Sequence, residues 1–126
     1  MVEVSAGELL DRISILQIKV QRLPPEQARV AARALTSAVE AKSPVLSSMS
    51  GLEELSARLL EVNLALWAAE DELRDLQREE RFGATFVEVA RSVCENNDLR
   101  AALKQEIDRL VGSEVGEQKS YPLPAV

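Results

Sequence analysis

The chain has 126 residues, of which 46% are hydrophobic and 29% charged, and this balance excludes a disordered protein. Its formal net charge is −6 and it has no histidine, so neither nucleic-acid binding nor histidine-based catalysis is expected. A single cysteine excludes an intramolecular disulfide, argues against a cysteine zinc site and favours a reducing cytoplasm. Neither a membrane span nor a signal peptide is expected from the apolar patterning.

The first half of the chain predicts two helices joined at a pair of prolines. Ser5 and Glu8 form a capping box, in which each side chain bonds the other residue's backbone amide. A heptad seam follows and ends before Pro24, because a proline disfavours helical backbone in the residue before it. An alanine-rich helix over 25–42 is expected to pack closely on the first, and residues 43–51 read as a linker.

The longest regular pattern predicts one helix over about 52–80. Apolar residues recur there at alternating steps of three and four, as in a coiled coil: Leu52, Leu55, Leu59, Val62, Leu66, Ala69, Leu73 and Leu76. A second apolar stripe of Leu60, Leu64 and Trp67 predicts that this helix is central, with a partner on two sides. Ser50 and Glu53 read as its capping box, and Gly83 as its C-cap.

The final helix is expected to begin at a third capping box, Thr85 to Glu88. Residues 95–98 are poor helix formers and predict a kink or restart, and Gly112 marks the end. Residues 1–112 therefore read as one helical domain. The tail over 113–126 reads as extended, and either disordered or docked through Tyr121.

Together these elements predict an all-α antiparallel helical-hairpin bundle of four to five helices. The long helix would span about 44 Å and the first helix about 26 Å, which leaves part of the long seam without a partner. A homodimer, or another protein partner, is therefore expected.

Four blocks of the sequence stand out: GELLDRISILQIK, NLALWAAEDELR, FGATFVEVARSVCENNDLRAALKQEI and GSEVGEQKSY. They resemble a family of small bacterial proteins that is catalogued as a domain of unknown function, over almost the whole chain from Gly7 to Tyr121. The resemblance implies a bacterial cytoplasmic protein and supplies no activity or functional residue. This chain departs from the family pattern at Cys94, where a tyrosine is expected, which puts in doubt any role for an aromatic ring there.

One polar cluster is a candidate ligand site. When the last two helices are folded about Gly83, polar side chains converge midway along the hairpin, near Asp71. Two interpretations remain open: interhelix salt bridges with one buried amide that fixes the register, or a site for a phosphate or carboxylate in which Trp67 stacks on Arg100. The candidate ligand-binding residues are Asn63, Trp67, Glu70, Arg74, Asn97, Arg100 and Lys104.

Paired carboxylates provide a weaker alternative. Carboxylates three residues apart share a helix face and can hold Mg²⁺ between helices, as helical nucleotide pyrophosphohydrolases do. The pairs here are Glu72 with Asp75 and Glu95 with Asp98. Glu8 and Asp11 repeat the spacing, although Glu8 is accounted for by its capping box. Cys94 continues an apolar line and is expected to be buried.

Function is the least determined property of this sequence. The heptad seams favour a non-enzymatic interaction or assembly module that needs no cofactor. The alternatives are an anionic small-molecule binding protein, for a phosphate or nucleotide, and a metal-dependent nucleotide hydrolase.

Overall fold

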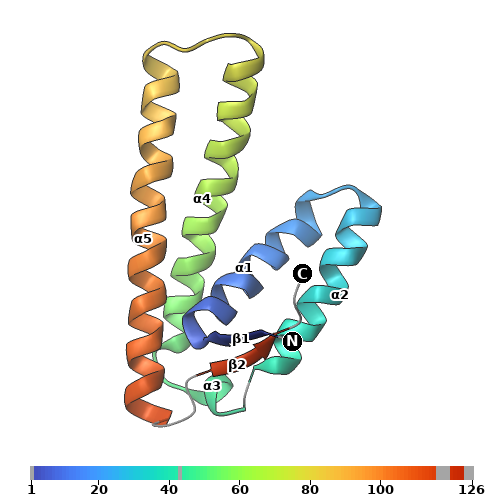
Figure 1. Ribbon diagram of the computed structural model, residues 1–126, viewed down its shortest axis with the longest axis vertical. Coiled ribbons are helices and arrows are strands. Elements are labelled where there is room, and N and C mark those ends of the chain that lie inside the picture. Colours follow the sequence, from blue (N-terminus) through green and yellow to red (C-terminus); the bar gives the residue numbers. More distant parts are fainter. Residues whose placement is uncertain (1, 43, 116–119, 124–126) are drawn as a thin grey trace.

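The structure, a computed structural model, describes residues 2–42, 44–115 and 120–123. It contains the helices α1 (Ala6–Arg22), α2 (Pro25–Ala41), α3 (Pro44–Ser48), α4 (Leu52–Arg78) and α5 (Ala84–Val115). Helices α4 and α5 form a long antiparallel hairpin, and α1 and α2 form a shorter one that diverges from it (Figure 1). The predicted all-α bundle of helical hairpins is confirmed.

A short antiparallel ribbon joins the two ends of the described chain. Strand β1 (Val2–Ser5) pairs with β2 (Ser120–Leu123), so that Val4 lies opposite Tyr121. Tyr121 is 1% exposed and belongs to the core, so of the two alternatives expected for the tail this residue fits the docked one. The predicted domain boundary at residue 112 falls inside α5.

Helix α1, not the longest helix, is the central one. It packs against α2 on one side and against α4 and α5 on the other. It buries apolar residues around much of its circumference, which α4 does not. The second apolar stripe of α4, which predicted a central position for that helix, is half-buried at Leu60, Leu64 and Trp67.

The first two helices have the predicted ends. Ser5 Oγ accepts a hydrogen bond from the Glu8 amide at 3.2 Å, and α1 ends before Pro24. The second half of that capping box is wrong, because the Glu8 carboxylate binds Lys104 of α5 instead. In the predicted linker, α3 forms and Leu46 is buried at 1% exposure.

Both predicted caps of the long helix are wrong. Its N-cap is Gly51, with φ +85°, and no side chain caps it, so Ser50 has no such role. At the other end Glu80 adopts φ +57° and its amide donates to the Gln77 carbonyl at 3.1 Å. The Arg81 amide donates to the Leu76 carbonyl at 2.8 Å, which completes a Schellman cap three residues before Gly83.

Helix α5 runs without interruption through the segment where a break was predicted. Thr85 lies inside the helix and does not cap it. Asn96 donates its amide to the Ser92 carbonyl at 2.8 Å, so this poor helix former is satisfied within the helix itself. Cys94 is exposed, and its predicted burial is wrong.

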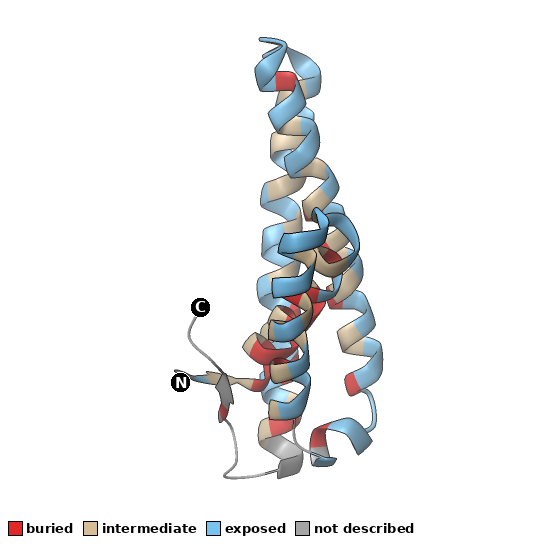
Figure 2. Ribbon diagram, turned by 90° about the vertical axis from the view of Figure 1, so that its right-hand side faces the viewer, coloured by how far each residue is buried: buried red, intermediate tan, exposed pale blue. Residues whose placement is uncertain are grey.

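Burial is concentrated where the two hairpins meet (Figure 2). Residues of α1 pack there on Leu52 and Leu59 of α4 and on residues of α5; the buried members of α5 are Leu103, Ile107 and Val111. Farther out, α4 buries Leu76 and no described residue of α5 before Leu103 is buried. None of the helices described here is both long and apolar enough to cross a membrane.

Candidate functional site

A polar network lies at the junction of α1, α4 and α5. Asp11 is 1% exposed, and its Oδ1 accepts hydrogen bonds from Asn63 Nδ2 at 2.9 Å and from Arg100 Nε at 2.8 Å. Its Oδ2 accepts from Arg100 Nη2 at 2.5 Å, so the guanidinium binds this carboxylate through two nitrogens. We call these residues, with the neighbours described next, the junction network: Glu8, Asp11, Ser14, Asn63, Arg100 and Lys104.

The remaining members complete the bonding of the buried groups. Asn63 donates a second bond to Ser14 Oγ at 2.7 Å, and Ser14 Oγ donates to the Asp11 carbonyl at 2.7 Å. Lys104 Nζ donates to Glu8 Oε2 at 2.5 Å and lies 3.8 Å from Asp11 Oδ2. Buried polar groups are costly when unpaired, so this pairing holds α1 at one position against the hairpin.

The network requires a close approach of α1 to α5 at Gly7. Its amide donates to Asp108 Oδ1 at 2.7 Å. A Cβ added at Gly7 would overlap the Lys104 carbonyl oxygen and lie 3.0 Å from Asp108 Oδ1. The block GELLD thus combines a close-approach glycine, the ion-pair partners Glu8 and Asp11, and two buried leucines.

Arg100 is held in its charged form by these neighbours. The hydrogen bonds that it donates to Asp11 raise the pKa of the guanidinium above its usual value, and the negative charges of Asp11, Glu8 and Glu70 add to this. Partial burial of the side chain opposes the rise in pKa. Arg100 therefore acts as a fixed cation that neutralises the buried Asp11.

The predicted mid-hairpin ligand site is divided between two environments. Asn63, Arg100 and Lys104 come together, but their polar atoms bind α1 and do not surround a space for a ligand. The others form no hydrogen bond or ion pair with this network among the described residues: Glu70, Arg74 and Asn97 are exposed and Trp67 is half-buried. Arg74 binds Asp71 at 2.5 Å on the surface. This geometry favours the interhelix network over the ligand site.

The predicted stacking of Trp67 on Arg100 is not among the ring contacts of the described residues. Among the described residues, the ring contact found joins Phe82 and Phe86, whose centroids lie 5.3 Å apart. The planar fork of Arg100 is already occupied by the carboxylate of Asp11, which accounts for the difference.

The partners on α1 were not predicted from the sequence. Asp11 and Ser14 are interleaved with the apolar residues Leu10 and Ile13, on the buried side of an amphipathic helix. Buried polar residues need hydrogen-bond partners from a facing helix, so these two positions could have predicted the network. The spacing of Glu8 and Asp11 predicted only a possible metal-binding pair.

The carboxylates proposed for Mg²⁺ are not gathered into a site. Glu72 and Asp75 on α4, and Glu95 and Asp98 on α5, are all exposed. Within residues 2–42, 44–115 and 120–123, no three acidic, cysteine or histidine side chains come together in a way that would hold a metal ion. Asp75 instead pairs with Arg78.

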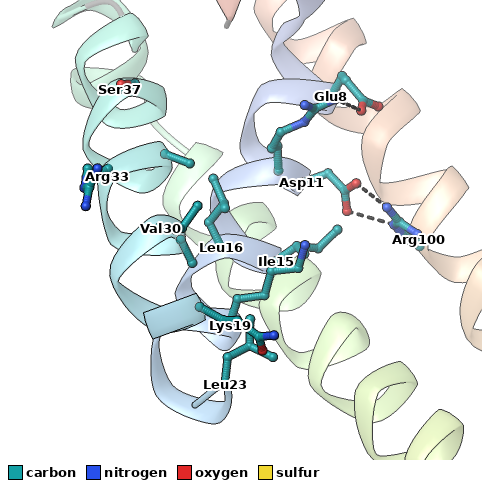
Figure 3. Close-up of a pocket in the computed structure, with 14 residues that line it drawn as sticks. Glu8, Asp11, Ile15, Leu16, Lys19, Leu23, Val30, Arg33, Ser37 and Arg100 are labelled. Carbon is teal, nitrogen blue, oxygen red and sulfur yellow. Dashed lines mark hydrogen bonds and ion pairs between the residues drawn. The ribbon is translucent and has the colours of Figure 1, made fainter. Parts of the chain in front are cut away.

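A groove of about 690 Å³ lies between α1 and α2, with Arg100 of α5 at one edge (Figure 3). The two helices contribute matching faces, because residues three and four apart line up along each of them. Its apolar lining consists of Ile15, Leu16, Leu23, Val30, Ala31 and Ala34. Val30 is 64% exposed, so a large apolar side chain faces open solvent at this groove.

The charges around the groove are mainly positive in a chain that is acidic as a whole. Arg12, Lys19, Arg33 and Arg100 line it together with two acids, Glu8 and Asp11. The junction network occupies both acids and Arg100. Lys19 and Arg33 form no ion pair or side-chain hydrogen bond with any other residue in the described part of the chain. These two cations are available to a ligand.

Comparison with known proteins adds no relative. The chain matches no protein-family model, no curated protein and no solved structure. The family resemblance of the four sequence blocks therefore stays a prediction.

Proposed function

We propose that this protein is a non-enzymatic interaction module that binds an acidic amphipathic helix of a partner protein in the groove between α1 and α2. The observation that carries the proposal is the pairing of an apolar floor with the cations Lys19 and Arg33, which no other described residue engages. An amphipathic helix would place its apolar face on Ile15 and Val30 and its carboxylates against these cations.

The dimensions of the groove suit a helix. The lining residues of α1 and its C-cap run from Glu8 to Leu23, a distance of about 22 Å along the helix axis. A partner helix of about 15 residues has that length. Because α2 packs mainly on α1 and β2, its outer face leaves room for a further helix beside it.

Charge complementarity favours an acidic partner over a basic or neutral one. Oppositely charged surfaces accelerate encounter and penalise partners of the wrong sign. The rest of the chain is strongly acidic, so a basic helix would be attracted to many sites, whereas an acidic helix would find its positive counterpart at this groove.

The alternatives from the sequence have less support. An anionic small molecule would use the same cations, and the groove volume lies in the range of small-ligand pockets. The groove follows α1 over four turns, however, which suits an elongated partner better. A metal-dependent hydrolase would need the four exposed carboxylates to converge. A cytoplasmic location in a bacterium remains an expectation based on the single cysteine and the family resemblance.

The proposal is tested with a synthetic peptide of about 15 residues that carries leucine on one helical face and glutamate on the other. Fluorescence anisotropy of the labelled peptide measures its binding to the full chain. We expect binding that Val30→Asp and Arg33→Glu each weaken by about tenfold or more, because both changes place a negative charge in the groove.

Two matched variants on the same helix serve as controls. Val39 is 49% exposed and Arg29 is also exposed, and neither lines the groove. Val39→Asp and Arg29→Glu should leave peptide binding unchanged. The proposal is overturned if the peptide does not bind, if the control variants weaken it equally, or if a leucine–lysine peptide binds as tightly. A groove that takes dodecanoate but not the peptide would also overturn it, in favour of a small anionic ligand.

A further inference from the structure

The outer half of the α4–α5 hairpin extends beyond the rest of the molecule (Figure 1). Helices α4 and α5 have 27 and 32 residues, whereas α1 has 17 and packs against them near one end. Residues 68–98 carry nine acidic and four basic side chains, so this outer hairpin is acidic while the groove is positive.

We infer that the acidic helix bound by the groove is α4 of a second copy of this chain, through the outer half of the hairpin. This inference rests on the proposed function and names its partner. One stripe along α4 and its C-cap has the required chemistry, with small and acidic residues recurring along a single face: Ala65, Ala68, Glu72, Asp75 and Glu79. All five are exposed in the single chain.

Each part of this stripe has a counterpart in the groove. The alanines allow the helix backbone to approach the apolar floor closely, and the carboxylates reach the cations at the rim. Glu72 forms no ion pair with another residue that the structure describes, and neither does Arg33, so each is free to bind the other. Asp75 and Glu79 are already paired, with Arg78 and Arg81 respectively.

The contact has to form between two molecules. Helix α5 is continuous from Ala84 to Val115 and α4 from Leu52 to Arg78, so the hairpin has no hinge that would let it fold back onto its own groove. Helix α1 is also fixed against the hairpin by the junction network. In the single chain the outer stripe and the groove therefore remain apart.

Two copies related by a twofold axis would form this contact twice. Each copy has one groove and one outer hairpin, so an isologous dimer satisfies both in both copies. Opposite charges at exposed positions make such a contact salt-dependent. We therefore expect the chain to form a dimer that dissociates progressively as the salt concentration rises.

Sedimentation velocity on the full chain, from about 1 to about 100 µM, tests the inference. Wild-type protein should shift toward a dimer with concentration. Arg33→Glu alone and Glu72→Arg alone should each weaken the dimer by about tenfold or more, because each places like charges opposite one another. Arg29→Glu and Glu53→Arg, exposed changes of the same kind outside the groove and the stripe, should leave the dimer intact.

The decisive experiment mixes the two single variants. In the mixed dimer, the glutamate introduced by Arg33→Glu faces the arginine introduced by Glu72→Arg, and the second contact is that of the wild type. The equimolar mixture should therefore dimerise about tenfold or more tightly than either variant alone. A wild-type chain that remains monomeric across the range, or a mixture that dimerises no more tightly than its components, overturns the inference. If the acidic peptide still binds the groove in that case, the proposed function stands and only the identity of the partner is wrong.

Discussion

The inner and outer halves of the α4–α5 hairpin contain ion pairs in opposite settings. In the inner half, where α1 packs on the hairpin, Asp11 of α1 is 1% exposed and is bound by the side chains of Asn63 and Arg100. In the outer half, Asp71 binds Arg74 with both side chains more than half exposed. For the buried Asp11, the ion pair takes the place of water as the bonding partner of the carboxylate. For the exposed Asp71, water competes with Arg74 to bind the carboxylate.

Because of this difference in burial, the two regions have different roles. A surface ion pair contributes little to stability, because water solvates its members almost as well when they are apart. A buried pair is costly to break, since the remaining partner is left without water. The inner network therefore fixes the angle between the hairpins, while the outer charges remain available for recognition.

The largest expected effect comes from breaking the inner network. Asp11→Ala leaves the Asn63 amide and the Arg100 guanidinium without their acceptor, and we expect it to lower the free energy of unfolding by about 3 kcal/mol. The matched change Asp71→Ala at the outer end should lower it by less than about 1 kcal/mol. Urea unfolding followed by circular dichroism measures both. Equal losses in the two variants would refute the division of tasks.

A second, smaller effect tests the close approach that the network requires. Gly7→Ala places a methyl group against the Lys104 carbonyl, and the backbones must separate to admit it. We expect a loss of about 1–3 kcal/mol in the free energy of unfolding.

Gly83→Ala is the matched control at the outer end. An added Cβ at Gly83 has nothing within 4 Å, and the residue has no positive φ. The change should be neutral or stabilise the chain by about 0.5 kcal/mol, because it restricts the unfolded state. Thermal unfolding of both variants measures the difference. If Gly7→Ala is as stable as the wild type, α1 does not need to approach α5 closely.

Periodicity predicted the fold well because apolar spacing reports directly on helices. The prolines at 24 and 25 ended α1 correctly, and the heptad seam predicted α4 to within two residues of its end. Local chemistry was less reliable at the helix ends. Glu80 occupies a left-handed position that glycine usually takes, and nothing in its side chain signals this. Asn96 was expected to break α5, but the long contact with α4 outweighs its weak helix preference.

The candidate site was predicted in part, because the sequence predicted how α4 pairs with α5 but not where α1 packs on them. Pairing α4 and α5 about their turn predicted that Asn63, Arg100 and Lys104 lie at similar positions along the hairpin axis. The crossing of α1 over that hairpin depends on tertiary packing, which seam spacing does not specify, so Asp11 and Ser14 were missed. The groove depends on the angle between α1 and α2, which periodicity also leaves open.

The smallest expected effect concerns a buried polar group at the β1–β2 ribbon. The Tyr121 hydroxyl is buried with no hydrogen-bond partner among the described residues, in contrast to the fully paired Asp11. Burial raises the pKa of Tyr121 above its ordinary value of 10.0, so the folded state holds the phenolic proton more tightly than the unfolded state does. The contribution of the protonated Tyr121 to the free energy of unfolding is complete below pH 10. It is lost as the pH rises through the higher pKa of the folded state.

Replacing this hydroxyl should therefore change the pH dependence of stability more than stability itself. We expect Tyr121→Phe to be as stable as the wild type, or more stable, at about pH 7, since the change removes a buried polar group that has no partner. Above about pH 10 the wild type should lose stability faster than the variant, and urea unfolding of both proteins from about pH 7 to about pH 11 would measure the difference. Parallel pH profiles would mean that the hydroxyl is hydrated in the folded protein, and that the ribbon of β1 and β2 does not seal this end of the core.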